Sequence, residues 1–252
     1  MIRLFVQVPL HADREVALEG DPAHYLIRVM RLAEGDELRL FNGTDGEWSA
    51  RITGIGKRTC RLRVGTLVEA QGAGPDLELH VALVKRGPLE TIVEKATELG
   101  VRRIRLLRTE RTNADHTNLD RLAAIAREAA EQCGRLDVPR IDPAERLDDR
   151  LAAWEAGRAL MFCDEAGDAP GAVAGLLREN PGPWAVLIGP EGGFTAAERA
   201  AIRACPGAVP VSLGARVLRA DTAAIAALAI WQLTLGEAVG LEVRAALPQL
   251  RG

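Results

Sequence analysis

Hydrophobic and polar residues alternate along much of the first part of the chain, as they do in strands that bury one face. This pattern predicts strands over residues 3–8, 37–41, 48–55 and 60–68. Asn42-Gly43 and Asp45-Gly46 supply turn residues between two of these strands. Residues 21–30 begin with Asp-Pro and continue with apolar residues at helical spacing, which predicts a short helix. Residues 1–70 are therefore expected to form a small, mostly β domain.

The pattern changes after residues 71–76, where glycine, proline and small residues predict a linker. Short apolar runs then alternate with longer segments of helical periodicity. The predicted strands are 77–84, 101–107, 159–163, 185–188 and 209–213, and the predicted helices are 89–99, 119–133, 196–204 and 222–235. This alternation is typical of a parallel sheet covered by helices on both faces, so residues 77–252 are expected to form an α/β domain.

Composition and charge narrow the class of protein. Of the 252 residues, 48% are hydrophobic and 27% are charged, which is enough apolar surface for a globular core. The net charge of −3 excludes a strongly basic nucleic-acid coat, although frequent arginines leave room for a local basic face. The four cysteines are far apart and lack metal-ligand spacing, so neither a disulfide nor a metal site is expected. No signal pattern or long apolar run is present, and we expect a soluble, cytoplasmic protein.

The stretch 186–194 reads VLIGPEGGF, an apolar strand that ends in a flexible turn around a glutamate. Thr195 follows as a helix N-cap, with Glu198 at capping-box spacing. Ligands of open α/β sheets bind beyond the carboxyl ends of the strands, and glycines let them approach the backbone. The turn is neither a phosphate loop nor GxGxxG, and its carboxylate favours a cationic or hydroxyl-bearing ligand over a phosphate. A plain strand-to-helix turn is an equally good interpretation of this stretch alone.

A second stretch, 211–223, reads VSLGARVLRADTA and also ends a strand at a glycine. The loop that follows mixes apolar residues with Arg216 and Arg219 before the helix signal Asp221-Thr222. Two such strand ends can face one pocket, in which apolar residues hold a flat ring and the arginines face an anionic partner.

LIGPEGGFTAAE and LGARVLRADTAAIAAL together resemble the carboxyl-terminal signature of the SPOUT methyltransferase superfamily. Within it, the chain resembles the ribosomal RNA small subunit methyltransferase E family, the 16S rRNA uridine-N3 methyltransferases. Three other segments are similar, in the same order and over most of the chain: HYLIRVMRLAEGDELRLFNG, LVKRGPLETIVEKATELGVRRIRLLRTERT and REAAEQCGRLDVPRI. The chain departs from the family at Asp221, where the family usually has glutamate.

The resemblance implies a PUA-like, barrel-type RNA-binding domain followed by a SPOUT domain with a trefoil knot near the C-terminus. It implies a homodimer, no metal, 16S rRNA or the small ribosomal subunit as partner, and S-adenosylmethionine as cofactor, held by loops 162–165, 187–193 and 213–219. The cofactor-binding residues that it implies are Phe162, Cys163, Asp164, Leu187, Gly189, Pro190, Glu191, Gly192, Leu213, Gly214, Val217, Leu218, Arg219 and Thr222.

The resemblance also suggests roles for individual side chains. Arg219 is expected to stabilise the developing uridine anion, with Asp221 as the base or as the group that orients Arg219. Glu191 is expected to hold a ribose hydroxyl, or the turn itself, or to attract the sulfonium. The candidate RNA contacts are Arg3, Arg28, Arg31, Asn42, Lys85, Arg111, Gln132 and Arg135. Any one of these arginines can equally be a solvated surface charge, and helix 222–235, with Trp231, fits a dimer contact or the core equally well.

Two other functions remain open at this stage. One is a non-catalytic RNA-binding relative, which the intact glycine turns disfavour. The other is a SPOUT enzyme that modifies a different RNA, such as a ribose hydroxyl of transfer RNA. A nucleotide hydrolase is disfavoured because the lysine, Ser/Thr and metal carboxylates that it needs are not found in the pattern.

Overall fold

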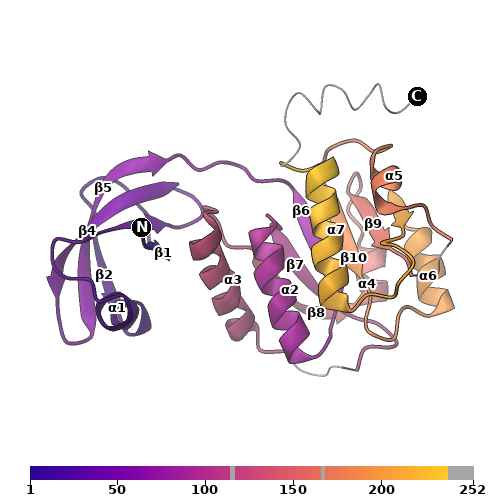
Figure 1. Ribbon diagram of the computed structural model, residues 1–252, viewed down its shortest axis with the longest axis horizontal. Helices are drawn as coiled ribbons and strands as arrows, with labels where there is room; N and C mark the ends of the chain where they lie inside the picture. The colour runs from indigo at the N-terminus through magenta and orange to yellow at the C-terminus, as the bar shows by residue number, and fades with distance from the viewer. Residues whose placement is uncertain (114–116, 166–167, 238–252) are drawn as a thin grey trace. The chain divides into compact units, whose positions relative to one another are not determined.

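The structure is a computed structural model that describes residues 1–113, 117–165 and 168–237 (Figure 1). Its chain contacts form two compact units. Unit 1 comprises residues 1–73 and 130–138, and unit 2 comprises residues 74–129 and those from Pro139 onward. Within the described residues, no helix has the length and apolar character needed to cross a membrane.

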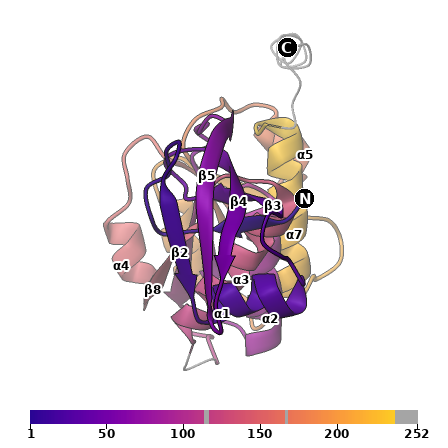
Figure 2. The same ribbon diagram turned by 90° about the vertical axis from the view of Figure 1, so that its left-hand side faces the viewer.

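Unit 1 is built on a five-stranded sheet in the order β1-β3-β4-β5-β2. β1 pairs with β3 in parallel, and the other pairs are antiparallel; Figure 2 shows β2, β5 and β4 side by side. The predicted helix is present, but it is an α-helical turn, α1, that continues into a π-helical turn, η1. The bounds are β1 Arg3–Phe5, β2 Glu15–Glu19, α1 Asp21–His24, η1 Tyr25–Val29, β3 Glu37–Phe41, β4 Glu47–Ile55 and β5 Thr59–Glu69.

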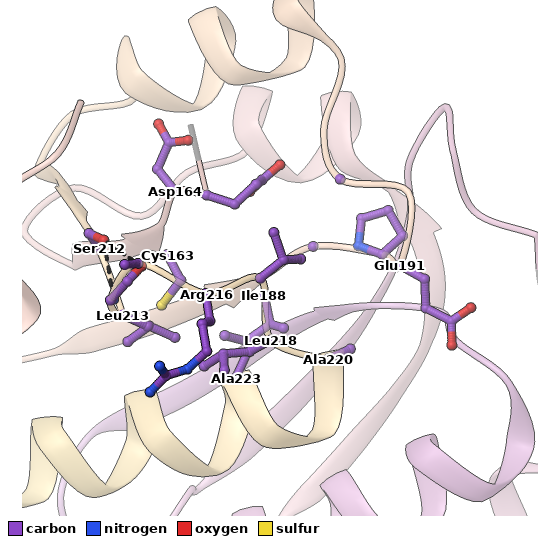
Figure 3. A pocket seen from close by; sticks show the side chains of 17 residues that line it. Cys163, Asp164, Ile188, Glu191, Ser212, Leu213, Arg216, Leu218, Ala220 and Ala223 are labelled. Carbon is purple, nitrogen blue, oxygen red and sulfur yellow. Dashed lines mark hydrogen bonds between the residues drawn. The ribbon is translucent and has the colours of Figure 1, made fainter. Parts of the chain in front are cut away.

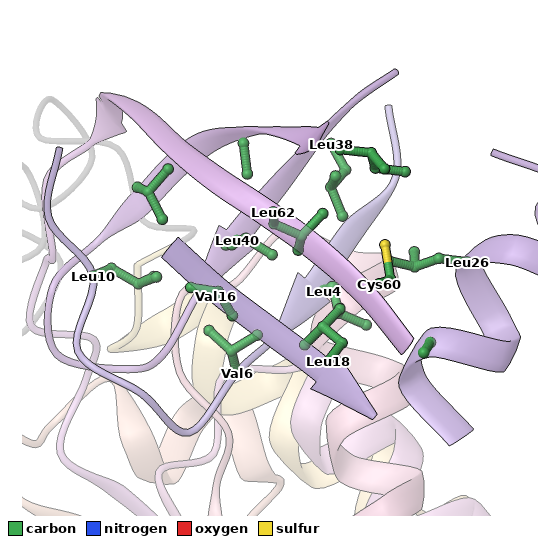
Figure 4. Packing of buried hydrophobic residues seen from close by; sticks show 14 residues of the cluster. Leu4, Val6, Leu10, Val16, Leu18, Leu26, Leu38, Leu40, Cys60 and Leu62 are labelled. Atoms are coloured by element: carbon green, nitrogen blue, oxygen red, sulfur yellow. The ribbon is translucent and has the colours of Figure 1, made fainter. Parts of the chain in front are cut away.

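The core of unit 1 follows the alternation in the sequence (Figure 4). Leu38 and Leu40 of β3 and Leu62 and Val64 of β5 are fully buried in one hydrophobic cluster, while Glu37, Arg39, Arg61 and Arg63 beside them are more exposed. Burial of each such leucine contributes about 1.5–3 kcal/mol. Cys60 lies in the same cluster as a free thiol, where it packs as a small apolar residue of the core.

Unit 2 contains a six-stranded sheet in the order β11-β9-β10-β6-β7-β8, and every pair in it is parallel. β10 lies between β9 and β6, and β11 lies beyond β9, so the carboxyl ends of β9, β10 and β11 are neighbours at one edge of the sheet. That edge is where open parallel sheets bind ligands. The bounds are β6 Leu77–Ala82, β7 Arg103–Arg108, β8 Arg140–Arg146, β9 Ala159–Cys163, β10 Trp184–Ile188 and β11 Ala208–Val211.

Helices cover both faces of this sheet, as the sequence predicted. α4 and α6 contribute to a cluster with Phe162 and Leu187 on one face. α7 packs against β10 and α2 on the other face, and Figure 1 shows α2 beside it. Trp231 of α7 is only 2% exposed, which favours the core interpretation for this residue. The bounds are α2 Arg86–Glu98, α3 Leu119–Cys133, α4 Leu147–Ala152, α5 Ala172–Leu176, α6 Ala196–Arg203 and α7 Ala220–Thr234.

A buried ionic cluster joins β6, β7 and β8. Arg105, 7% exposed, donates from Nε to Glu78 Oε2 at 2.7 Å and from Nη1 to Asp142 Oδ2 at 3.3 Å. Neutral His80 places Nε2 2.9 Å from the same oxygen of Glu78, and burial lowers the pKa of His80. Burial opposes the charge of Glu78, but hydrogen bonds from His80 and Arg105 outweigh it and lower the pKa of Glu78 to about 2. The carboxylate of Glu78 therefore stays charged in the interior because Arg105 and His80 donate hydrogen bonds to it.

Candidate active site

A cavity opens at the sheet edge where β9, β10 and β11 end (Figure 3). Its empty volume is about 740 Å³, including the part open to solvent. Figure 3 shows Ile188, Leu213 and Leu218 gathered around the same space, with Cys163 beside them. Of the predicted cofactor residues, the lining includes Cys163, Asp164, Gly189, Pro190, Glu191, Leu213, Gly214, Val217 and Leu218.

The glycine turn after β10 is shaped by close packing and by a helix cap. A Cβ at Gly189 would lie 2.7 Å from Cε2 of Phe194, so only glycine fits without displacing that ring. Gly193 has φ +66° and donates from N to Pro190 O at 2.9 Å, which closes the turn. Thr195 then begins α6 with the predicted capping box: its Oγ1 accepts from Glu198 N, and Glu198 accepts from Thr195 N. The turn therefore enters the cavity with a fixed shape.

The loop after β11 presents its backbone to the cavity. Gly214 has φ +120°, which L side chains rarely adopt, and its N–H donates to Ser212 Oγ at 3.2 Å. Within the part of the chain that the structure describes, the backbone N–H groups of Leu213, Val217 and Leu218 have no protein acceptor. Three such donors beside apolar side chains can bind the edge of a flat heterocycle and cover its face.

The end of β9 contributes a thiol and a buried carboxylate. Burial raises the pKa of the Cys163 thiol to about 12, so the thiol is neutral at physiological pH and lines the cavity as a small apolar group. The side chain of Asp164 is 0% exposed and accepts hydrogen bonds from Arg199 and Arg203 of α6. The carboxylate of Asp164 therefore joins the end of β9 to α6. Because the carboxylate is engaged there, we expect Asp164 to contact a cofactor through its backbone.

We expect Asp164→Asn to lower the free energy of unfolding by about 1–3 kcal/mol, because two arginines lose a buried, charged acceptor. The cofactor affinity is expected to fall as well, since the end of β9 loses its attachment to α6. Asp168→Asn is the matched control: Asp168 meets the same two arginines but its side chain is 60% exposed. Urea unfolding and calorimetric titration measure both effects, and equal losses in the two variants would contradict this role.

The two predicted catalytic residues stand at the start of α7, next to the cavity lining in sequence. Arg219 is exposed and is the N-cap residue, but it caps through its backbone: its carbonyl oxygen accepts from Ala223 N at 2.8 Å. Asp221 is half-buried in the first helical turn, where the helix dipole stabilises a carboxylate. Neither residue lines the cavity, and neither does Thr222, which is exposed. The guanidinium of Arg219 is thus not needed to hold the helix.

The four remaining predicted cofactor residues are Phe162, Leu187, Glu191 and Gly192, and only Glu191 lines the cavity. Phe162 and Leu187 are buried in the core cluster under α4 and α6, and the Phe162 ring packs on Phe194 at 5.5 Å. Gly192 is outside the cavity lining, and its carbonyl oxygen accepts from Arg111 Nη1 at 2.9 Å. Glu191 lines the cavity but is exposed, and Figure 3 shows its carboxylate directed away from Leu213 and Leu218. The observed conformation does not place that carboxylate against a ligand in the cavity.

Three of the predicted RNA contacts are engaged inside unit 1. Arg3 donates to Glu47 and to the carbonyl oxygens of Ala130 and Arg135, and its guanidinium lies 4.6 Å from the Phe41 ring centroid. Asn42 bonds to neighbouring groups, including Asp45 Oδ2 and Val8 O.

Arg135 meets the carboxylate of Asp137 through Nε and Nη2, each at 3.0 Å. These bonds hold Arg3, Asn42 and Arg135 within unit 1, and their contact with RNA stays a prediction.

The other predicted RNA contacts are exposed. Arg28 is in η1, and Arg31 follows with an uncommon φ of +56°. Lys85 precedes α2, and Gln132 is in the last turn of α3. Arg111 is exposed as well, although its Nη1 is bonded to the glycine turn.

Several lining residues were not among the predicted site residues. Ser212 is just beyond the end of β11, and Ala220 and Ala223 are at the start of α7. Ile188, at the end of β10, was not named singly but belonged to the predicted loop 187–193. The signal for the alanines was present, because small residues at a helix start leave room for a ligand. Arg216 belonged to the predicted loop and lines the cavity, where Figure 3 shows its side chain beside α7. Among the described residues, no group of three or more His, Cys, Asp or Glu side chains is arranged to hold a metal.

Comparison with known proteins gives consistent matches over both units. Residues 73–232 match the RNA methyltransferase domain family, and residues 18–65 match the RNA methyltransferase PUA domain family. A ribosomal RNA small subunit methyltransferase E of Rickettsia conorii is 32% identical over 90% of this chain and 93% of its own. The enzyme of that name from Synechocystis is 33% identical over 90% of this chain and 76% of its own. A protein from Legionella pneumophila, solved with SAM bound, superposes with a TM-score of 0.83 at 29% identity, over 94% of this chain and 98% of its own.

Proposed function

Because the chain belongs to the RNA methyltransferase family that includes the ribosomal RNA small subunit methyltransferases E, we propose that it methylates 16S ribosomal RNA with S-adenosylmethionine. The target within that RNA is N3 of a uridine. The observation that carries the proposal is the cavity at the ends of β9, β10 and β11, formed by the loops that the sequence pattern singled out.

The residues present suit this cofactor. The unpaired N–H groups of Leu213, Val217 and Leu218 match the acceptor edge of an adenine, and the side chains of Ile188 and Leu218 offer apolar cover. The neutral thiol of Cys163 adds no charge near a sulfonium. The other cofactor residues predicted above are retained in this proposal, with Asp164, Phe162 and Leu187 acting through their backbone or by shaping the loops. Arg219 acts on the uridine, because it is outside the cavity lining.

The reaction requires removal of the uridine N3 proton, because the protonated nitrogen is a poor nucleophile. When bound, S-adenosylmethionine supplies an electrophilic methyl group. Arg219 stabilises the negative charge that develops on the uracil ring as the proton leaves. Asp221 accepts that proton or orients the Arg219 guanidinium, and its place in the first turn of α7 sets it two residues beyond Arg219. The loops around the cavity hold the two reactants in line.

The domain organisation that we propose is a PUA-like RNA-binding domain over residues 1–70, a linker over 71–76 and a SPOUT domain over 77–252. The RNA then contacts exposed cations of the first domain and the residues Lys85, Arg111 and Gln132 of the α/β part. A trefoil knot near the C-terminus remains part of the proposal, supported by the insertion of β10 between β9 and β6. The expected place of action is the cytoplasm, where small ribosomal subunits are assembled.

A homodimer completes the proposal, and the apolar groove between α5 and α7 supports it. Gly171, Val173 and Leu177 line the groove from α5 and its two cap positions, and Ile230 lines it from α7. Val173 is 50% exposed and Leu233 of α7 is 67% exposed, which is more apolar surface than an unpartnered helix needs to show.

The test is methyl transfer from labelled S-adenosylmethionine to small subunits isolated from a strain that lacks this methylation. We expect the label in 3-methyluridine after digestion of the 16S RNA to nucleosides. Label on another base, or on transfer RNA offered in parallel, would reassign the enzyme to another RNA. Cofactor binding without any transfer to either RNA would favour a non-catalytic relative.

A further inference from the structure

A cleft on unit 1 carries positive charge that the fold itself does not neutralise. It lies between α1 with η1 and the turn that joins β4 to β5. Its lining comprises Asp21, His24, Ile27, Arg28, Lys57 and Arg58. Three permanent cations thus face one carboxylate, in a chain whose net charge is −3.

The backbone fixes two of these cations at the rim of the cleft. Gly56 N donates to Thr59 O at 2.9 Å, so Lys57 and Arg58 are the central residues of a tight turn. Gly20 N donates to Arg58 O at 3.3 Å, which ties this turn to the start of α1. The side chains of Lys57 and Arg58 are exposed. The backbone of the turn is already fixed, so binding a ligand carries no entropy cost for ordering it.

The cations of this cleft differ from two other exposed arginines of the same unit, although Arg61 is also exposed and, among the described residues, without a salt-bridge partner. Arg51 pairs with Glu37 at 2.7 Å, and Arg63 pairs with Glu15 at 2.9 Å. Among the residues that the structure describes, Arg28, Lys57 and Arg58 have no salt-bridge partner within 4.0 Å, and neither does Arg31 just beyond η1. A cleft with three cations that lack a salt-bridge partner has the charge complement of a phosphodiester backbone.

We propose that this cleft is a phosphate-binding site for a strand of ribosomal RNA, with Lys57 and Arg58 as its principal contacts and Arg28 opposite them. The inference rests on the proposed function, because it assigns the RNA substrate to a particular surface of the PUA domain. The exposed apolar side chains of Val29 and Met30 follow Arg28 directly in the sequence and offer apolar contact to the same strand. The site positions RNA and does not read its sequence.

The test compares RNA binding by Lys57→Gln/Arg58→Gln with that by Arg51→Gln/Arg63→Gln, which removes the same charge from paired positions. The probe is a single-stranded RNA fragment of 16S sequence, titrated from 50 to 200 mM salt. For the cleft variant we expect affinity to fall about tenfold, and the slope of log K against log salt to flatten by about 1.4, since each lost contact removes about 0.7. The control variant is expected to keep a slope close to that of the wild-type protein.

Cofactor affinity and melting temperature are measured on the same samples, and both are expected to match the wild-type values in the cleft variant. The proposal is overturned if the cleft variant retains the wild-type slope, or if the control variant loses as much affinity. It is equally overturned if only the affinity for duplex RNA falls. These readouts do not depend on methyl transfer, so a failure of the proposed reaction and a failure of the cleft are distinguishable.

Discussion

Arg219→Ala is expected to lower the rate of methyl transfer about 100- to 1,000-fold, the usual effect of removing one group that stabilises a developing anion. Cofactor affinity is expected to stay nearly constant, because Arg219 is outside the cavity lining. The start of α7 should persist, since Arg219 caps the helix through its carbonyl oxygen. Single-turnover transfer at saturating RNA measures the rate, and calorimetric titration with S-adenosylmethionine measures the affinity.

Arg219→Lys is the matched variant, because it keeps the charge but loses the planar pair of donors. We expect Arg219→Lys to transfer methyl groups faster than Arg219→Ala, because the positive charge is retained. If Arg219 only supported the structure, the retained charge would not raise the rate. Equal losses of rate and of cofactor affinity in Arg219→Ala would reassign the residue to cofactor binding.

Arg105→Met is expected to cost about 3–5 kcal/mol of unfolding free energy, because it removes the buried cation that two buried carboxylates share. Glu78 and Asp142 both accept hydrogen bonds from Arg105, and methionine can fill the volume but cannot donate. Arg51→Met is the control: Arg51 pairs with Glu37 at the surface, where such pairs contribute about 0–1 kcal/mol. Urea unfolding of the two variants at neutral pH measures the difference.

The loss in Arg105→Met should depend on pH with a definite sign. Glu78 has a pKa of about 2 in the folded protein and an ordinary value of 4.5, so its charged form contributes stability above pH 4.5. That contribution disappears as the pH falls from 4.5 toward 2. The gap between the wild-type protein and Arg105→Met is therefore largest at neutral pH and shrinks in acid. A gap that is constant over this range, or a loss no larger than that of Arg51→Met, would contradict the role of the cluster.

The elements with strong periodicity could be predicted from the sequence. The bounds predicted for β3, β9 and α3 are the observed ones, because β3 and α3 have one clear apolar period and β9 is a short, continuous apolar run. β8 was not predicted because its inward-facing residue Asp142 is charged, and its burial depends on arginines of a neighbouring strand. β2 was missed although its sequence, EVALE, alternates clearly, and α5 was missed because it is short and contains a glycine.

The cavity could be predicted only in part. The glycine turns of Gly189 and Gly214 indicated that the two strand ends bind a ligand, and the structure brings both into one cavity. The sequence could not show that Asp164 faces two arginines of α6, because those partners are 35 and 39 residues away. It could not distinguish Arg3, whose guanidinium bonds to several groups of unit 1, from Arg28, which lines a cleft with Lys57 and Arg58. Side-chain partners of this kind depend on strand order, which local periodicity does not encode.

A crystal structure of the protein grown with S-adenosylmethionine tests the central claim most directly. We expect the cofactor in the cavity at the ends of β9, β10 and β11, with its adenine accepting hydrogen bonds from backbone N–H groups of the loop from Leu213 to Leu218. Density for the cofactor at another surface, with this cavity filled only by solvent, would contradict the account.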